Sequence, residues 1–398
     1  MVNRLELIGN NLFSNKRYIR RFSLYLLRIF AYMQTSICIF SFFSGAGFLD
    51  LGFEKAGFKV DFVNEISPSF IKAYKYARSC MGIEEPRFGY SKDVNEFLLN
   101  RSSELKQYIQ IEHQEGSLIG FIGGPPCPDF SIAGKQRGRE GDNGKLSQSY
   151  VDLICEQKPD FFLFENVKGI WRTSKHRAYY EELKAKLSED FYIKDRLCNA
   201  LEFGAPQDRD RMILFGIKKE VAHDRNLHIE SFNWDAYRLY DINSIKSMPW
   251  PGVEPFKKDS IKKSPEGIME SLTTEYWFKK NEVESHPNSS CFFTPKAGLI
   301  RMQTIPEGDV SKKSYKRLHR WRFSPTACYG NNEVHLHPYK ERRISAAEAL
   351  AIQSLPKEFC FPLDMSLSDI FKSIGNGVPY VLANGIAKTI RSFINSED

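Results

Sequence analysis

The feature that most constrains the fold is a largely apolar run at residues 37–43 that ends in a glycine turn. The run, ICIFSFF, is rich in β-branched and aromatic residues and is too short for a typical helix. Strands that are apolar on both faces belong to parallel sheets with helices on both sides. Gly45 and Gly47 follow directly and indicate a tight turn. The sequence therefore predicts an α/β domain with a mostly parallel sheet.

The succession of strand, helix and strand continues along the first half of the chain. Residues 49–56 have helical spacing and stop at Gly57, after which residues 60–63 form a second strand-like run. Further buried strands are predicted at residues 118–122, 161–164 and 212–217. Ligands bind at the carboxyl edge of such sheets, so polar residues that follow the strands are candidate site residues. We predict a doubly wound, Rossmann-like fold.

The rest of the chain differs in character. From about residue 220 the periodic pattern fades among scattered prolines, lysine pairs and tryptophans, which indicates a second, smaller and irregular domain. Helical order returns at a capping box formed by Ser345 and Glu348, and a closing helix is predicted at residues 379–393. The predicted parts are a basic N-terminal extension patterned as an amphipathic helix (1–35), a main domain (36–219), the second domain (220–343), a connecting helical segment (344–368) and a segment that completes the main domain (369–398).

Charge favours an acidic partner such as nucleic acid. The formal net charge is +7, and residues 235–343 hold 19 lysines and arginines against 13 acidic residues. Eight cysteines without any Cys-x-x-Cys pair fit neither a disulfide framework nor a zinc site, so we expect a reducing, cytoplasmic setting. The apolar stretch at residues 22–33 is interrupted by Arg28, and no run is long enough to span a membrane.

The first glycine turn suits an adenosine-bearing cofactor. Gly45 and Gly47 allow close approach of the backbone, and Glu65, eighteen positions beyond Gly47, can bind ribose hydroxyls. NAD, FAD and S-adenosylmethionine sites share this pattern, and a purely structural turn also needs glycine. The motif alone leaves these alternatives open.

A second candidate motif places Cys127 between two prolines directly after a strand. Most lone cysteines are buried apolar residues. Here Pro126 and Pro128 stiffen the backbone around the sulfur, and a segment rich in glycine, lysine and arginine follows, which could close over a phosphate backbone. This setting favours an exposed nucleophile over a core residue.

Two further motifs offer charged side chains. Glu165 leaves an apolar strand, where burial can raise the pKa of a carboxyl enough to hold a proton near neutral pH. Arg209 and Arg211 alternate on an extended segment and so point to one side. Either motif could be purely structural.

Taken together and in this order, these motifs resemble those of the DNA cytosine-5 methyltransferase family, of the bacterial restriction-modification type. The resemblance extends over most of the chain outside residues 220–340. It rests on residues 43–47, Pro126-Cys127, Glu165-Asn166-Val167, the Gln-x-Arg-x-Arg pattern of Gln207, Arg209 and Arg211, the helix at 342–353 and the Gly-Asn-Gly-Val-Pro string at 375–379.

The resemblance implies an enzyme that methylates carbon 5 of cytosine in a specific duplex DNA sequence, with S-adenosylmethionine as methyl donor and no metal. It implies the methyltransferase version of the Rossmann-like fold and makes the second domain the DNA-recognition domain. The implied catalytic residues are Cys127, which adds to carbon 6 of a flipped-out base, Glu165, which protonates ring nitrogen N3, and Arg209, which holds the base.

The same resemblance assigns the binding residues. Those implied for the cofactor are Phe43, Gly45, Ala46, Gly47, Leu49, Glu65, Ile66, Asp93, Val94, Asn376 and Val378, and those implied for DNA are Ser131, Lys135, Arg137, Arg139 and Arg211. The chain departs from the family pattern at Pro128, where glutamine is more usual, and at Gly377, where a small side chain is more usual. Pro128 puts in doubt any base contact made by that glutamine.

Three alternatives remain open on the sequence alone. Cys291-Phe292-Phe293-Thr294 is loosely similar to the Cys-Phe-Thr signature of tRNA methyltransferases of the same fold, although an extra phenylalanine interrupts the match. A catalytically inactive, cofactor-binding regulatory protein would share the fold. The alternating His335 and His337 could bind a metal, but surface or phosphate-facing histidines are expected instead.

The architecture also indicates a biological setting. One methylase domain without long regulatory extensions is typical of bacterial enzymes that protect DNA from a partner restriction endonuclease, and such an enzyme is expected to act as a monomer. Met33 stands where proteins of this family often begin, so residues 1–32 are either an upstream extension or the product of a misplaced start.

Overall fold

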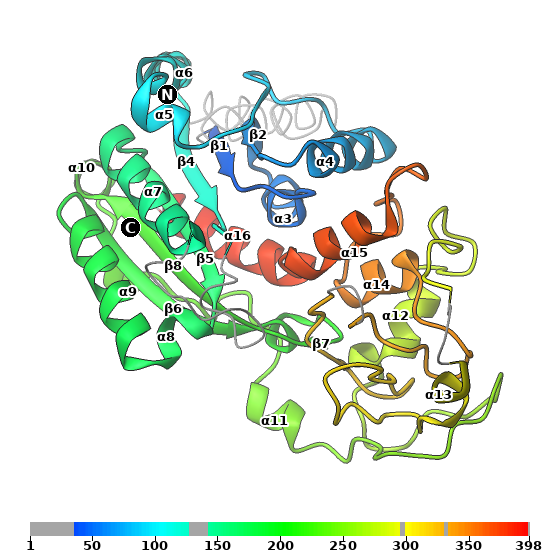
Figure 1. Cartoon of the computed structure of the whole chain (residues 1–398). Helices are drawn as coiled ribbons and strands as arrows, with labels where there is room; N and C mark the ends of the chain where they lie inside the picture. Colours follow the sequence, from blue (N-terminus) through cyan, green and yellow to red (C-terminus); the bar gives the residue numbers. More distant parts are fainter. Residues whose placement is uncertain (1–35, 127–141, 295–298, 330–332, 397–398) are drawn as a thin grey trace, which may run out of the picture.

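A computed structural model describes residues 36–126, 142–294, 299–329 and 333–396 (Figure 1). A seven-stranded sheet in the order β3-β2-β1-β4-β5-β8-β6 forms its centre. The first five strands of that order pair in parallel, whereas β8 runs antiparallel to both of its neighbours. The strands are β1 (Ile37–Phe42), β2 (Lys59–Asn64), β3 (Tyr90–Ser91), β4 (Leu118–Gly123), β5 (Phe161–Val167), β6 (Phe191–Asn199) and β8 (Asp210–Lys218).

Helices cover both faces of the sheet, as the doubly apolar strands predict. Along β1, Ile39 enters a core with α3 (Phe48–Lys55) and α16 (Tyr380–Ile394), and the neighbouring Phe40 enters another core on the opposite face. The helices that contribute to the second core are α5 (Glu96–Leu99), α6 (Ser102–Gln114), α7 (Asp142–Gln157), α8 (Gly169–Arg172) and α9 (Ser174–Leu187). The helix α4 (Pro68–Cys80) also belongs to this domain. The predicted doubly wound architecture is confirmed.

The predicted closing helix is α16, and it packs on α3 although more than 300 residues separate them. Asn384 Nδ2 donates to the main-chain oxygen of Gly52 at 3.0 Å. Leu382, Ile386 and Ile390 of α16 are buried in the same core as the strands. The end of the chain thus becomes part of the main domain.

The second domain has little regular structure in its described part. The elements α10 (Lys219–Asp224) and η3 (Ile229–Ser231) come before it. Its own elements are short: α11 (Ile242–Lys246), η4 (Glu270–Leu272), α12 (Thr274–Lys280), α13 (Leu299–Thr304) and β9 (Ser324–Pro325). The strand β9 pairs in parallel with β7 (Gln207–Asp208), which joins the two domains. Leu227, Phe232 and Trp234 lie in the core of the main domain, so the irregular domain begins beyond them.

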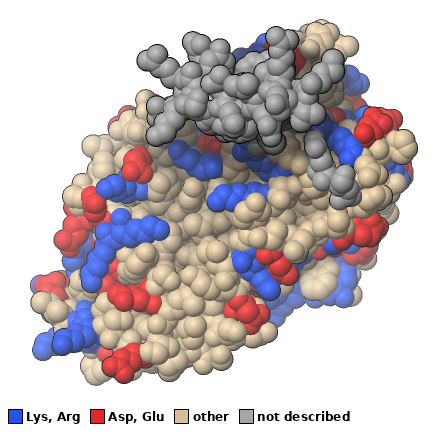
Figure 2. Space-filling model, turned by 180° about the vertical axis from the view of Figure 1, so that it is seen from behind, with Lys and Arg blue, Asp and Glu red and all other residues tan. Residues whose placement is uncertain are grey.

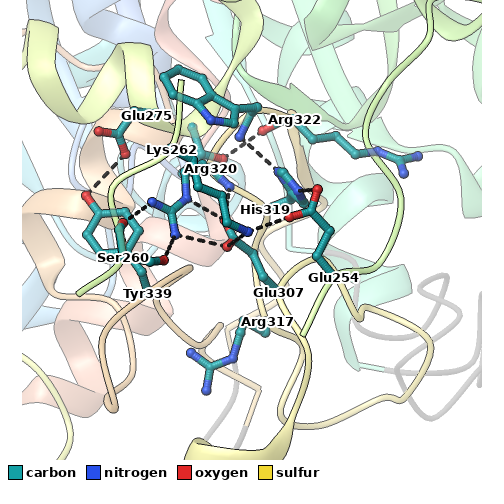
Figure 3. Close-up of polar contacts among 12 residues, drawn as sticks. Glu254, Ser260, Lys262, Glu275, Glu307, Arg317, His319, Arg320, Arg322 and Tyr339 are labelled. Carbon is teal, nitrogen blue, oxygen red and sulfur yellow. Dashed lines mark hydrogen bonds and ion pairs between the residues drawn. The ribbon is translucent and has the colours of Figure 1, made fainter. Parts of the chain in front are cut away.

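Buried charged side chains stabilise this domain in place of a sheet. Arg320 Nε lies 2.8 Å from Glu307 Oε1 and its Nη2 lies 3.0 Å from Glu307 Oε2, with both side chains almost fully buried (Figure 3). Arg320 also donates to Ser260, and Lys262 lies beside Glu307. Arg317 donates to the main-chain oxygens of four residues, namely Met302, Ile305, His337 and Lys340. These bonds satisfy backbone groups that a sheet would otherwise pair.

A connecting layer joins the two domains. The predicted capping box is present: Ser345 Oγ accepts from Glu348 N, and Glu348 Oε2 accepts from Ser345 N, at the start of α14 (Ala346–Ile352). This helix and α15 (Leu367–Asn376) share one core with α12 of the second domain and with Phe48 of α3.

The expectation of surface or phosphate-facing histidines is wrong. His335 and His337 are only 2% and 1% exposed. His337 Nε2 lies 3.3 Å from Glu348 Oε1, and burial lowers the pKa of His335 to about 3. Both rings therefore belong to the interior, where they are neutral or paired with a carboxylate.

Candidate functional site

The carboxyl end of β1 leads into a glycine turn with a left-handed backbone. Phe43, Gly45 and Gly47 have φ angles of 54°, 58° and 79°. A Cβ atom at Gly47 would lie 2.4 Å from Arg78 Nη1. Both the backbone conformation and the lack of room therefore require glycine at position 47.

Arg78 stabilises this turn by hydrogen bonds to its backbone. It is 2% exposed, and it donates to the main-chain oxygens of Ala46 at 3.2 Å and Gly47 at 2.8 Å. Glu54 pairs with it at 3.0 Å, and its guanidinium stacks over the ring of Tyr74 at 4.0 Å. Sequence analysis missed this arginine because an arginine in an amphipathic helix normally lies in solvent.

A buried carboxylate stands behind the turn. Asp50 accepts hydrogen bonds from Ser41 Oγ at 2.8 Å and Tyr74 Oη at 3.0 Å. Burial raises the pKa of Asp50, the positive charge of Arg78 opposes this shift, and the resulting pKa is about 6. The turn thus rests on a polar network that holds its backbone in one conformation.

Glu65 connects the end of β2 to the glycine turn. Its Oε2 accepts from Gly45 N and its Oε1 from Ser67 N, both at 2.8 Å. Burial raises the pKa of Glu65, although these backbone hydrogen bonds oppose the shift. The next residue, Ile66, is 68% exposed, which is unusual for a large apolar side chain beside a buried carboxylate.

The remaining predicted cofactor residues lie around the same edge. Asp93 Oδ1 accepts from Asn95 N at 2.9 Å just after β3, and Val94 is buried beside it. Leu49 lies on α3 and is mostly buried. From the far end of the chain come Asn376, which is exposed, and Val378, which is buried in the main core.

The glycine at position 377, a departure from the family pattern, has a local cause. A Cβ atom there would lie 2.2 Å from the ring of Phe48. Phe48 is 2% exposed and contacts Phe359 edge to face at 5.1 Å. The large ring on α3 therefore occupies the space that a side chain at position 377 would need.

An adenosine-bearing cofactor fits this edge. The turn presents backbone without side chains, Glu65 offers carboxylate oxygens, and Ile66 offers an exposed apolar surface for a flat ring. This combination of a bare backbone, a carboxylate and an apolar platform matches the parts of a nucleoside.

A second group of charged residues lies where β5 meets β8. Glu165 is 8% exposed, and its Oε1 lies 2.6 Å from Arg211 Nε. Burial raises the pKa of Glu165, and Arg211 and Arg209 oppose that rise. A Cβ atom at Gly124 would lie 2.5 Å from Glu165 Oε2. The carboxylate thus lies against the segment that follows β4, three residues before Cys127.

Arg209 lies just before β8 and is 1% exposed. Its Nη1 donates to Ala327 O at 2.9 Å, and its Nη2 donates to Gly375 O at 2.6 Å. Burial and the nearby Arg211 lower the pKa of its guanidinium. Within the part of the chain that the structure describes, its Nε is a buried donor without a partner. Arg209 therefore joins both domains at one point.

Several predicted residues lie outside the part of the chain that the structure describes. The described ranges do not include Cys127, nor the predicted DNA contacts Ser131, Lys135, Arg137 and Arg139. Arg211, also predicted to contact DNA, is 7% exposed and paired with Glu165. Asn166 is buried and its Oδ1 accepts from Val167 N at 2.8 Å, which fixes the end of β5.

One group of potential metal ligands occurs among the described residues. Cys38, Asp61 and Glu112 have ligand atoms within 4.8 Å of one another. Cys38 and Asp61 lie in the amino-terminal halves of β1 and β2, and Glu112 lies near the end of α6, so the group is at the edge of the sheet opposite the site. Lys59 pairs with Asp61 at 3.0 Å and Arg87 with Glu112 at 2.9 Å, so both carboxylates already have cationic partners.

The fold has a counterpart among solved structures. A prophage-encoded protein of E. coli, described as a DNA modification methyltransferase, matches 91% of this chain and 100% of its own at a TM-score of 0.63, with 26% sequence identity. The seven-stranded sheet with its single antiparallel strand is thus the fold of S-adenosylmethionine-dependent methyltransferases.

Sequence comparison narrows this class. The model of the C-5 cytosine-specific DNA methylase family matches residues 37–392. The type II methyltransferase M.NmeDI of Neisseria meningitidis serogroup C is 55% identical over 90% of this chain and 84% of its own length. M.FnuDI of Fusobacterium nucleatum is 30% identical over 90% of this chain and 96% of its own. The chain belongs to the C-5 cytosine-specific DNA methylase family and is a DNA cytosine-5 methyltransferase of the type II restriction-modification kind.

Replacement of Gly47 by alanine is expected to weaken cofactor binding. The added methyl group would clash with Arg78, and alanine at this position would have an unfavourable φ of 79°. The turn must therefore shift. We expect the affinity for S-adenosylhomocysteine, measured by calorimetry, to fall by about tenfold or more. Gly82→Ala is the matched control, because Gly82 has a φ of 64° but open space around it. Equal affinity in the two variants would contradict this explanation.

Proposed function

We propose that the enzyme methylates a cytosine flipped out of a specific duplex sequence, with Cys127 adding covalently to carbon 6. The observation that carries the proposal is the buried Glu165 carboxylate, which lies against Gly124 on the segment that leads to Cys127. A carboxyl group held beside a cysteine-bearing segment at the end of a parallel strand can serve the same base as the thiolate.

The reaction needs covalent activation because carbon 5 of cytosine is a weak nucleophile. The Cys127 thiolate forms a bond to carbon 6, and the electron pair of the ring double bond makes carbon 5 nucleophilic while N3 takes a proton. Carbon 5 then takes the methyl group as the bond between that methyl carbon and its sulfonium sulfur breaks. Loss of the carbon 5 proton to a base, which can be water, restores the double bond and releases the thiolate, and N3 returns its proton to the carboxylate of Glu165.

Glu165 is proposed to supply the proton at N3. A carboxyl group whose pKa is raised by burial keeps its proton to a higher pH than an exposed one, which suits a general acid. Arg211 sets the orientation of the carboxylate through the 2.6 Å ion pair. The DNA contact that the family resemblance implies for Arg211 stays a prediction beside this positioning role.

Arg209 is proposed to hold the base. Two of its nitrogens are fixed by Ala327 O and Gly375 O, and its buried Nε has no partner among the described residues. A guanidinium fixed in this way can offer its Nε–H to a carbonyl oxygen of the base. Its positive charge also favours the thiolate form of a neighbouring cysteine.

When bound, S-adenosylmethionine supplies the methyl group as an electrophile attached to a sulfonium. The glycine turn at residues 43–47 is proposed to approach its methionine part, Glu65 to bind its ribose and Ile66 to pack on its adenine. Asp93 is proposed to bind the adenine amino group, and Asn376 with Val378 to close the pocket. The aromatic face of Phe43 suits a sulfonium cation.

Duplex DNA must open for this reaction. A stacked base cannot reach the end of β5, so the protein is proposed to flip it out at a cost of about a few kcal/mol. Ser131, Lys135, Arg137 and Arg139 are proposed to contact the DNA, and the basic second domain to read the sequence. On the face shown in Figure 2, basic and acidic side chains are interspersed, so the basic surplus does not gather in the visible part of that face.

The enzyme is further proposed to protect DNA from a restriction endonuclease of the same sequence specificity, acting as a monomer. Several relatives carry the type II methyltransferase designation, which pairs a methyltransferase with such a nuclease. No helix in the described part of the chain is long and apolar enough to cross a membrane.

A duplex that contains 5-fluorocytosine should trap the covalent step. Fluorine cannot leave as a proton does, so the adduct through Cys127 persists. With S-adenosylmethionine present, we expect a denaturation-resistant complex from the native enzyme and none from Cys127→Ser. Cys155→Ser is the control because Cys155 lies on α7 and has no part in the proposed mechanism. An adduct with Cys127→Ser would refute the mechanism.

The methylation rate should fall as pH rises through the raised pKa of Glu165. The protonated carboxyl is the active form, so its loss removes the acid. Glu165→Gln is expected to lower the single-turnover rate about 10²- to 10⁴-fold and to abolish this limb of the pH profile. Glu112→Gln, a buried glutamate paired with Arg87 at the opposite edge, should keep the native profile. An unchanged profile in Glu165→Gln would show that another group donates the proton.

Bisulfite sequencing of host DNA should reveal one short methylated sequence when the gene is expressed. DNA from these cells should resist a nuclease that cuts this sequence, and DNA from cells with Cys127→Ser should be cut. Diffuse methylation without a shared sequence would contradict the proposed role in protection.

A further inference from the structure

Two buried glutamines lie at the point where both domains and the end of the chain meet. Gln207 lies in β7 and Gln353 follows α14, and neither side chain has any exposed surface. Gln207 Nε2 donates to Gln353 Oε1 at 3.1 Å. Two amides that bond to each other inside a core are costly unless their other groups are also satisfied.

Gln207 fixes the side of this junction that faces the proposed base pocket. Its Oε1 accepts from Ala327 N at 3.1 Å and from Arg209 Nη1 at 3.4 Å. Arg209 itself donates to Ala327 O. One amide oxygen therefore sets the relative position of the arginine and of a segment that belongs to the second domain.

Gln353 fixes the side that faces the proposed cofactor pocket. Its Nε2 donates to Ile374 O and, at 3.3 Å, to Gly377 O, and its main-chain oxygen accepts from Tyr380 N at 2.9 Å. Ile374 and Tyr380 flank the segment that holds Asn376 and Val378, and Gly377 lies between these two residues. The segment at residues 374–380 therefore cannot move without breaking a bond to Gln353.

The two amides use their donors fully. An amide nitrogen carries two hydrogens, and each Nε2 donates to two acceptors, because Gln207 Nε2 also bonds to Ile352 O at 3.3 Å. A displacement on one side leaves a buried donor or acceptor unpaired on the other, so the arrangement favours concerted movement. Arg209 reinforces the link, since it bonds to both Ala327 O and Gly375 O.

We propose that Gln207 and Gln353 are positioning residues that couple occupancy of the cofactor pocket to the placement of Arg209 and Ala327 at the base pocket. The inference rests on the proposed function, which assigns the cofactor to residues 376–378 and the base to Arg209. Coupling of this kind is reciprocal, so the cofactor should tighten DNA binding by the same factor by which DNA tightens cofactor binding.

The test is an equilibrium binding experiment that needs no catalysis. The affinity for a duplex with the site found by bisulfite sequencing is measured with and without S-adenosylhomocysteine. In the native enzyme we expect the ligand to tighten DNA binding by roughly fivefold or more. In Gln207→Leu and Gln353→Leu the ratio should fall towards one, and the double variant should resemble either single variant because the two amides act through one bond.

Asn288→Leu provides the matched control. Asn288 is equally buried in the connecting core, where it exchanges two hydrogen bonds with the backbone of Phe361 at 2.8 and 2.9 Å, away from the junction. It should destabilise the protein without changing the ratio. Three outcomes would overturn the inference. The ligand could leave the DNA affinity of the native enzyme unchanged, both glutamine variants could keep the ratio of the native enzyme, or Asn288→Leu could lower the ratio as much as they do.

Hydrogen exchange gives a second measurement that does not depend on the leucine variants folding well. S-adenosylhomocysteine alone should slow exchange in residues 324–329 of the native protein, and the absence of such protection would overturn the inference. Cys127→Ser should keep the full binding ratio, because binding needs no thiolate. A failed covalent trap with a normal ratio would thus reject the mechanism alone, and a normal trap without coupling would reject this inference alone.

Discussion

The antiparallel pairing of β8 with β5 is the constraint on which the site depends. In this register Val167 lies opposite Arg211, and Glu165 lies opposite Ile213. The amino-terminal end of β8 therefore reaches the same edge as the carboxyl ends of β1, β2, β4 and β5. A parallel strand would carry Arg209 and Arg211 to the opposite edge, and Glu165 would be a buried carboxylate without a cation. Such a carboxylate would be too costly to keep ionised.

The shape of the site depends on glycines whose backbone packs so closely against neighbouring side chains that no Cβ atom would fit. Gly47 lies against Arg78, Gly124 against Glu165, and Gly377 against Phe48. In each case the neighbour is a large or charged side chain from a different element. The main effect of these glycines is therefore the absence of a side chain, not flexibility. Without a Cβ atom at these positions, separate elements can pack closely together at the site.

Polar side chains carry much of the structure where regular secondary structure is sparse. Arg317 and Arg320 organise the irregular domain through backbone oxygens and a buried glutamate. Gln207, Gln353 and Arg209 do the same at the junction between the domains. Because these groups are buried and their hydrogen bonds are directional, they fix one arrangement more strictly than apolar contacts would.

The doubly wound sheet, the closing helix and the capping box could all be predicted from the sequence, because they follow from local periodicity and from residues such as Ser345 and Glu348. The order of the motifs also identified the family, which the similarity to known methyltransferases confirmed. The three-dimensional structure was needed for the direction of β8, the pairing of Arg211 with Glu165, the support of the glycine turn by Arg78 and the burial of His335 and His337. These features depend on which distant residues meet, and local pattern carries no information about contacts between residues far apart in the chain.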